Sequence, residues 1–234
     1  MLREEINAAY AVEYSGHSIN GNTLTVYLPG KHIASRGDAL NIPMLTVTLS
    51  SPQEGIIKVS AVHHAGALYK GPFAEIKDEN PQVEITEKED TLIFKSGNLK
   101  AVIDKAPNAY KLAFYDGDKF LTESSYRNLA HMHNRDTGKN YMTEQLLIDV
   151  DEYVYGLGER FTPFVKNGQI VEMWNEDGGT SSEIAYKNIP FYITNKGYGV
   201  LVDNEGDVAY EIASEKVERV QFSVEGERLD YYFI

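Results

Sequence analysis

The sequence contains no cysteine. This absence excludes disulfide bonds, thiol catalysis and zinc sites with cysteine ligands. The chain also has no run approaching the ~18 apolar residues of a membrane-spanning helix. Lysine and arginine number only 22 against 35 aspartates and glutamates, and the resulting formal charge of −13 disfavours binding to nucleic acid or to an anionic membrane. A neutral ligand is compatible with this charge.

The N-terminal sixteen residues do not have the pattern of a targeting signal, because no apolar core is followed by a cleavage site. We therefore expect a soluble, cytoplasmic protein. The chain has 234 residues, of which 42% are hydrophobic and 11% aromatic. This length and composition predict a globular protein with a sizeable core.

Apolar and polar residues alternate along several segments, with a period of two. The four clearest apolar sets are Leu24, Val26 and Leu28; Leu45, Val47 and Leu49; Val220, Phe222 and Val224; and Leu229, Tyr231 and Phe233. Such alternation places one face of a strand on a core and the other toward water. We expect many of the sixteen tyrosines to be half-buried on such strands, with their hydroxyls reaching water.

Turn-forming residues recur at short intervals. Six such turns are Asn20-Gly21-Asn22, Ser96-Gly97-Asn98, Asp116-Gly117-Asp118, Asn195-Lys196-Gly197, Asn204-Glu205-Gly206 and Glu225-Gly226-Glu227. Glycine or asparagine there supplies the positive φ of tight hairpins. Short strands divided by such turns predict an all-β fold, a β-sandwich with few short helical turns. We interpret Glu123–Lys139 as a long loop with one helical turn, and Lys77–Pro81 as a surface loop within a single domain.

Two histidine groups are candidate metal ligands. His131 and His133 would project from one face of a strand, but no third ligand has suitable spacing and the surrounding run is polar. His63 and His64 would point to opposite faces of a strand, as edge or surface residues do. We therefore expect no metal site. An epimerase that uses a histidine and a carboxylate on one concave face is a further function class, and these histidines offer no evident pairing for it.

Motifs of several other enzyme classes are incomplete. The G-x-S-x-G elbow of serine hydrolases does not occur. Gly156-Leu157-Gly158 has no third glycine and no following helix pattern, so we interpret it as a tight strand-to-loop turn rather than a phosphate cradle. A glycosidase needs two carboxylates about 5–10 Å apart, which a sequence alone does not reveal.

The segment Trp174–Thr180 combines the sole tryptophan with an asparagine, two acidic residues and two glycines. Aromatic faces stack on sugar rings, while amides and carboxylates bond to hydroxyl groups. The segment is a candidate sugar-binding loop on these grounds. The alternative is a surface hairpin with Trp174 packed into the core.

A long match to a known protein family adds to this interpretation. YGLGERF (155–161) and NGQIVEMWNEDGGTSSEIAYKNIPFYITNKGYGVLVDN (167–204) closely resemble the N-terminal domain of bacterial α-xylosidases of glycoside hydrolase family 31. Further matching segments are SPQEGIIKV (51–59), GAL (66–68), FKSGNLKA (94–101), NYM (140–142) and SEKVERVQFSVEGERLDYYFI (214–234). The likeness covers the chain from about Leu40 onward, and the first forty residues match poorly.

The resemblance implies a galactose-mutarotase-like β-sandwich (a supersandwich) formed by residues 1–234. In this family the sandwich packs against a (β/α)8 barrel that follows it and carries the aspartate nucleophile and the aspartate acid/base. The nucleophile motif is absent from this chain, so the resemblance implies no catalytic residue, metal or cofactor here. Ile234 ends an alternating segment without a turn, and we expect the natural protein to continue into the barrel.

The resemblance also implies one substrate contact. In the family a sandwich loop reaches over the barrel mouth, and an aspartate on it contacts the sugar in the leaving-group subsite. The match places this role on Asp177, with Trp174 and Asn175 shaping the loop and Gly178-Gly179 giving it freedom. Glu176 stands where relatives often have arginine. Four positions are implied to pack between sandwich and barrel, namely Tyr155, Gly156, Gly158 and Glu159.

Two hypotheses follow. The first is the non-catalytic N-terminal sandwich of an α-xylosidase, which supports the barrel, lends Asp177 to an α-xyloside and helps to form a homo-oligomer of the full-length enzyme. The second is a free-standing carbohydrate-binding module. The isolated chain is expected to lack hydrolase activity under both.

Overall fold

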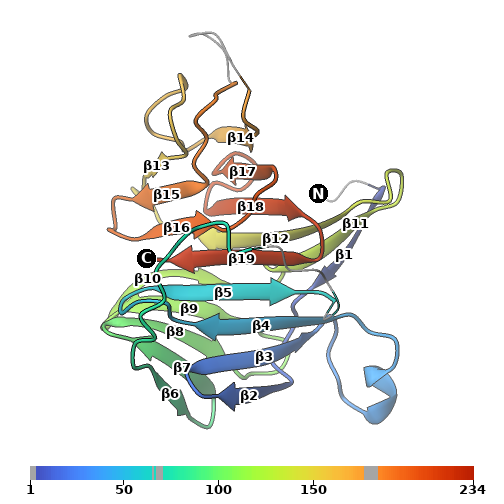
Figure 1. Cartoon of the computed structure of the whole chain (residues 1–234). Helices are drawn as coiled ribbons and strands as arrows, with labels where there is room; N and C mark the ends of the chain where they lie inside the picture. Colours follow the sequence, from blue (N-terminus) through green and yellow to red (C-terminus); the bar gives the residue numbers. More distant parts are fainter. Residues whose placement is uncertain (1–3, 65, 67–70, 177–183) are drawn as a thin grey trace.

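The chain folds into three antiparallel β-sheets (Figure 1). The computed structural model describes residues 4–64, 66, 71–176 and 184–234. In spatial order, the eight-stranded sheet consists of β13 (Val154–Gly156), β15 (Phe191–Thr194), β16 (Gly199–Val202), β19 (Arg228–Phe233), β5 (Ile57–Val62), β4 (Met44–Ser50), β3 (Thr23–Pro29) and β2 (Gly16–Asn20). The six-stranded sheet consists of β1 (Ile6–Tyr10), β11 (Ala130–Asn134), β12 (Asn140–Leu147), β18 (Arg219–Glu225), β17 (Val208–Ile212) and β14 (Gln169–Met173). The five-stranded sheet consists of β10 (Lys119–Ser124), β9 (Leu112–Asp116), β8 (Leu99–Asp104), β7 (Thr91–Ser96) and β6 (Glu84–Glu87).

The eight-stranded sheet packs against both other sheets. Its strand β19 contacts β12 and β18 of the six-stranded sheet, and its strand β5 contacts β8 of the five-stranded sheet. Strands β10 and β12 contact each other and join the two smaller sheets side by side. The expected all-β sandwich is therefore confirmed. Within the described residues the one helical element is the 3₁₀ turn η1 (Arg36–Ala39), and no helical segment has the length and apolar character needed to cross a bilayer.

The alternating segments form the predicted strands. In β3 the residues Leu24, Val26 and Leu28 are almost fully buried, and β4 buries every second residue in the same way. The six predicted turns all connect consecutive strands. Five of their glycines have positive φ, the exception being Gly206. Local pattern and turn chemistry thus agree with the final topology.

Strand β19 differs from the expected alternation because both of its faces are covered. Asp230 and Tyr232, which the period of two places toward water, are each only 3% exposed. Asp230 accepts a hydrogen bond from Arg228 Nε at 2.8 Å. Nearby, the carboxylate of Asp203 accepts hydrogen bonds from the backbone N–H groups of Phe73 and Ala74 at 2.8 and 2.7 Å. These bonds hold Phe73 and Ala74 beside Asp203, next to the outer face of β19.

One other expectation was wrong, and another holds for only some of the residues concerned. The stretch Glu123–Lys139 is not one long loop, because it contains β11, which pairs with β1 on one side and β12 on the other. Its polar composition lacks the alternation expected of a strand, although one of its partners, β12, follows it directly in the sequence. Several tyrosines are also fully rather than half buried, since their rings lie between the sheets. Examples are Tyr192, Tyr198, Tyr210 and Tyr231, each at most 1% exposed.

A buried glutamate accompanies these tyrosines in the core. Glu144 on β12 is 1% exposed, and its Oε1 accepts a hydrogen bond from Ser124 Oγ at 2.7 Å. Burial raises the pKa of its carboxyl from 4.5 to about 7. Glu144 therefore keeps its proton at pH values where the unfolded chain would release it.

This elevated pKa predicts a pH-dependent loss of stability. The folded state binds the proton more tightly than the unfolded state, so stability falls as pH rises from about 4.5 to about 7 and then levels off. The cost above pH 7 is of order 3 kcal/mol. Glu144→Gln removes it, and the variant should gain in melting temperature relative to the wild type between pH 5 and pH 8. Glu89→Gln, at an exposed position, is the control. An equal pH response in both variants would contradict the assignment.

Candidate functional site

The candidate sugar-binding loop begins where β14 ends. Trp174 directly follows this strand, and Asn175 forms an isolated parallel bridge with Ala185. The backbone N–H of Glu176 also donates to the carbonyl of Ala185 at 3.3 Å. The two stems of the loop are thus joined at its base. Asp177, the predicted sugar contact, lies outside the described residues, as do Gly178, Gly179 and Thr180.

Asn188 connects the two stems at this base, a role that is not predicted from the sequence. Its Nδ2 donates to the carbonyl oxygens of Trp174 at 2.6 Å and Ala185 at 2.8 Å. Its Oδ1 accepts a hydrogen bond from the guanidinium of Arg160. One amide therefore connects the two loop stems to the YGLGERF segment. No sequence motif marks it, because its partners Trp174 and Arg160 lie 14 and 28 positions away.

The glycines of the YGLGERF segment allow backbone to approach backbone. Gly158 has φ +84°, and a Cβ built on it would lie 2.2 Å from the carbonyl oxygen of Lys187. Gly156 has φ +108°, and its Cβ would lie 2.7 Å from the carbonyl oxygen of Phe191. These contacts confirm the strand-to-loop turn with close backbone approach. Both close approaches are between segments of the sandwich itself.

Trp174 is not packed into the core. It is 53% exposed and lines an open cavity of about 710 Å³. Polar groups of Arg160, Gln169 and Glu172 line the same cavity. An indole face beside amide, guanidinium and carboxylate groups can bind a sugar by stacking and hydrogen bonding. Glu172 is the one carboxylate among the described lining residues, whereas glycoside hydrolysis takes a pair.

Exposed apolar side chains are frequent at Trp174 and in the segments that lead into and out of its loop. We call this set the apolar edge, and it consists of Phe161, Phe164, Ile170, Trp174, Tyr186 and Ile189, which are 47–79% exposed. Ile184 lines both the Trp174 cavity and a neighbouring one formed with Phe161 and Tyr186, so the two are adjacent. The strands β13, β14 and β15 that carry or flank this edge gather at one end of the molecule, at the top of Figure 1.

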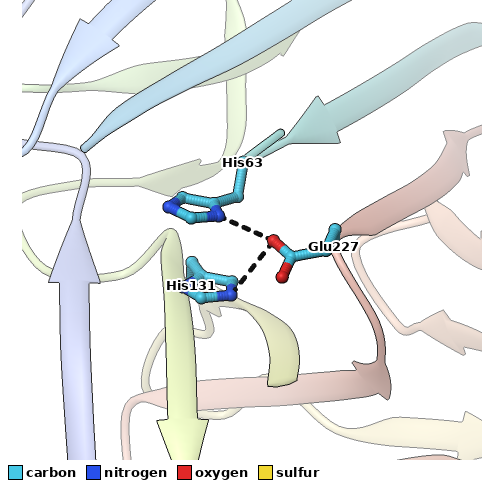
Figure 2. Close-up of side chains that lie close together, drawn as sticks. All are labelled: His63, His131 and Glu227. Carbon is cyan, nitrogen blue, oxygen red and sulfur yellow. Dashed lines mark hydrogen bonds and ion pairs between the residues drawn. The ribbon is translucent and has the colours of Figure 1, made fainter. Parts of the chain in front are cut away.

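The histidines are arranged differently from the sequence interpretation. His133 Nδ1 lies 2.7 Å from Asn140 Oδ1 and does not pair with His131 in a ligand set. His131 instead stacks on His63, with ring centroids 3.7 Å apart and an interplanar angle of 7°. Glu227 Oε2 lies 2.6 Å from His63 Nδ1 and 3.1 Å from His131 Nε2 (Figure 2). Histidine and carboxylate groups therefore do converge, contrary to the expectation that none pair.

Strand register explains this convergence. Arg228 pairs with Val62 in the β19–β5 ladder, so the residues just beyond the ladder, Glu227 and His63, face each other. Their backbones bond as well, since His63 N donates to the carbonyl of Glu227 at 3.0 Å. Burial, followed by the neighbouring His63, lowers the pKa of His131 below 6.5. No local signal predicts this contact between residues 164 positions apart.

Comparison with known proteins shows matches along the whole chain. A family model described as the glycosyl hydrolase 31 N-terminal galactose mutarotase-like domain matches residues 46–211. The alpha-xylosidase XylQ of Lactiplantibacillus pentosus is 45% identical over 232 residues, which are 99% of this chain and 30% of that protein. An alpha-xylosidase of Emericella nidulans is 42% identical over 253 aligned residues, covering 100% of this chain and 32% of that protein. The chain thus spans about a third of the length of these curated relatives. Both alignments extend over almost all of the first forty residues, which we expected to match poorly.

Solved structures share the fold. The cycloalternan-forming enzyme of Listeria monocytogenes, in complex with a pentasaccharide substrate, superposes with a TM-score of 0.78 at 18% identity, covering 98% of this chain and 21% of that one. A GH31 alpha-xylosidase from a soil metagenome, complexed with xylose, gives a TM-score of 0.69 at 19% identity, covering 94% of this chain and 32% of that one. At these identities the likeness concerns the fold alone.

The hydrogen bonds of Asn188 lead to a prediction that the fluorescence of Trp174, the sole tryptophan, can test. Asn188→Ala removes the hydrogen bonds to the carbonyls of Trp174 and Ala185, so the Trp174 backbone should become more mobile. We expect lower fluorescence anisotropy and faster acrylamide quenching of Trp174. Asn195→Ala is the matched control, because Asn195 bonds in the same manner to Asp151 and Tyr153 in another loop. Unchanged quenching in Asn188→Ala would contradict the anchoring role.

Proposed function

Since this chain belongs to glycosyl hydrolase family 31 and forms its N-terminal galactose mutarotase-like domain, we propose that it is the non-catalytic sandwich of an α-xylosidase. The whole enzyme would remove terminal α-xylose with retention, through a covalent glycosyl-enzyme intermediate and without metal or cofactor. In this proposal the sandwich supports the catalytic barrel and contributes one loop to the leaving-group subsite. The cytoplasmic location and homo-oligomeric assembly expected from the sequence stay predictions.

The observation that carries the proposal is the apolar edge. A concentration of exposed apolar side chains on a folded domain is typical of a surface that binds another protein, a membrane or a ligand. Phe164, at 79% exposed, and Tyr186, at 68%, would be costly to leave in water. The relatives that match this chain extend over roughly three times its length, so their remaining part offers a partner of the same polypeptide. We propose the catalytic barrel as the occupant of this edge.

The position of Trp174 supports a direct contribution to sugar binding. Its indole is exposed at the root of the candidate loop and belongs to the same edge that would face the barrel. In this proposal the loop that starts there contributes to a pocket formed between the two parts. We propose that Trp174 forms an apolar wall of this pocket and that Asp177 accepts hydrogen bonds from sugar hydroxyls. The negative charge of Glu176 beside it would favour a neutral substrate.

Substitution within the apolar edge should weaken docking without unfolding the domain. The test protein is a chimaera in which this chain replaces the matching segment of the Lactiplantibacillus pentosus relative. Ile170→Asp places a charge in the proposed interface and should lower the melting temperature and activity of the chimaera, because burying an unpaired charge costs several kcal/mol. In the isolated chain the same change should matter little, since Ile170 is 63% exposed.

Ile19→Asp is the matched control for this experiment. Ile19 is also an isoleucine on a strand and is 50% exposed, but it lies on β2, outside the apolar edge. The control should leave the chimaera unchanged. If both variants affected the chimaera equally, the apolar edge would not be the docking surface.

The loop residues should act on substrate affinity. In the chimaera, Trp174→Ala should raise KM for p-nitrophenyl α-xyloside about three- to tenfold, the equivalent of one aromatic contact. Asp177→Asn should raise it about tenfold or more, because a hydrogen bond to a charged acceptor is lost. Tyr126→Ala, an exposed aromatic outside the edge, is the control and should leave KM unchanged. Unchanged KM in both loop variants would refute the subsite role.

The free-standing carbohydrate-binding module is the alternative function, and the Trp174 cavity favours it in part. It requires that the isolated chain binds xylosides and that binding falls in Trp174→Ala. The α-xylosidase proposal requires that the isolated chain neither hydrolyses nor binds them measurably, since one wall of the pocket belongs to the barrel. Titration calorimetry of the isolated chain separates the two.

A further inference from the structure

A second group of chemically active side chains lies away from the apolar edge. His63 follows β5, His131 lies on β11, and Glu227 lies in the turn between β18 and β19 (Figure 2). One potential ligand atom from each, His63 Nδ1, His131 Nε2 and a Glu227 oxygen, lies within 4.8 Å of the others. The three residues thus converge from three separate segments of the chain.

We propose that His63, His131 and Glu227 form a site for a divalent transition-metal ion, with Zn²⁺ as the best match. Two imidazole nitrogens and one carboxylate oxygen are a ligand set that Zn²⁺ takes, with a fourth position left for water. Imidazole favours Zn²⁺ and its neighbours over Mg²⁺ or Ca²⁺, which take oxygen ligands. None of these three residues belongs to the apolar edge.

The present distances are close to those of a coordinated ion. Zn–N and Zn–O bonds of about 2.0–2.2 Å place tetrahedral ligand atoms roughly 3.3–3.5 Å apart. His131 Nε2 and Glu227 Oε2 are 3.1 Å apart, and His63 Nδ1 is 2.6 Å from the same oxygen. Outward movements of Glu227 and His63 would bring these separations to the required values. Their side chains are 26% and 27% exposed, so an ion can enter from solvent.

His131 supplies a second observation that points to a ligand. The residue is only 7% exposed, and its buried Nε2 has no aligned hydrogen-bond partner, although it lies within 3.1 Å of the Glu227 carboxylate. A buried nitrogen without an aligned hydrogen bond carries a desolvation cost. Coordination of a metal ion by its lone pair would remove this cost.

The surrounding residues hold the carboxylate in place as second-sphere groups do in metal sites. Asn140 Nδ2 donates to Glu227 Oε1 at 2.7 Å, which leaves Oε2 facing the histidines. Asn140 is itself fixed by His133, whose Nδ1 lies 2.7 Å from Asn140 Oδ1. Hydrogen bonds of this kind orient metal ligands and raise affinity. His133 therefore belongs to the site as a support and not as a ligand.

Binding must also change the ring geometry. A histidine lone pair lies in the ring plane, and the His63 and His131 rings are stacked with an interplanar angle of 7°. Two nearly parallel rings cannot both point their lone pairs at one ion between their planes. We therefore infer that at least one ring turns out of the stack when the ion binds. An ion held in this way would connect the end of β5 to β11 and to the β18–β19 turn.

The test is Zn²⁺ titration of the metal-stripped 234-residue chain by calorimetry, accompanied by thermal unfolding. We expect one ion per chain and a melting temperature that rises with Zn²⁺ concentration, as preferential binding to the folded state requires. His63→Ala and Glu227→Gln should each abolish site binding. Asn140→Leu should weaken it by about ten- to a hundredfold, because it removes the hydrogen bond to Glu227.

The controls distinguish this site from weak, nonspecific binding of Zn²⁺ to other histidines. His32 Nδ1 lies 2.6 Å from Glu13 Oε2, the same type of pair but with no third ligand among the residues that the structure describes, and His64 is an exposed neighbour of His63. His32→Ala and His64→Ala should both retain wild-type binding. Co²⁺ absorption provides an independent readout, and a tetrahedral spectrum should appear in wild type and not in His63→Ala. Absence of Zn²⁺ binding to the wild type, or binding that survives in both His63→Ala and Glu227→Gln, would overturn the proposal.

Discussion

The burial of β19 on both faces is the constraint on which the rest of the structure depends. On one face, Phe233 stacks on Phe114 of the five-stranded sheet at 4.1 Å, and Tyr231 meets Phe222 of the six-stranded sheet at 5.3 Å. A single strand therefore fixes the eight-stranded sheet against both smaller ones. On the other face, Lys58 lies 3.5 Å from Asp203 and 3.8 Å from Asp230, so these buried carboxylates have a nearby cation. Buried charges are tolerated in this way only when they are paired.

Both sites are positioned by the ladders that begin at β19. Toward one edge of its sheet the order continues through β16 and β15 to β13, which leads into the YGLGERF segment and, through Arg160 and Asn188, to Trp174. On the other side the β19–β5 register sets Glu227 opposite His63. The apolar edge and the group formed by His63, His131 and Glu227 thus lie in different parts of the same domain. Occupation of one need not disturb the other.

The sequence predicted those features that local chemistry determines. Alternation at Leu24–Leu28 and the glycine turns specified strands and hairpins, and the resemblance specified the fold and family. It failed where partners are remote. Asp203, beside β19, bonds to the distant Phe73 and Ala74, β11 pairs with the distant β1, and His63 meets Glu227 through register. Asn188 likewise has no motif, since its importance lies in carbonyls that folding brings to it.

The central claim is that the apolar edge is covered by the catalytic part of the same enzyme. Hydrogen–deuterium exchange tests it most directly, by comparing the isolated chain with the same chain fused to the catalytic part of its Lactiplantibacillus pentosus relative. The account predicts slower exchange in residues 160–176 and 184–190 of the fused protein, with unchanged exchange in β2 and β3. Equal exchange of the edge in both proteins, or protection centred on β2 and β3, would contradict it.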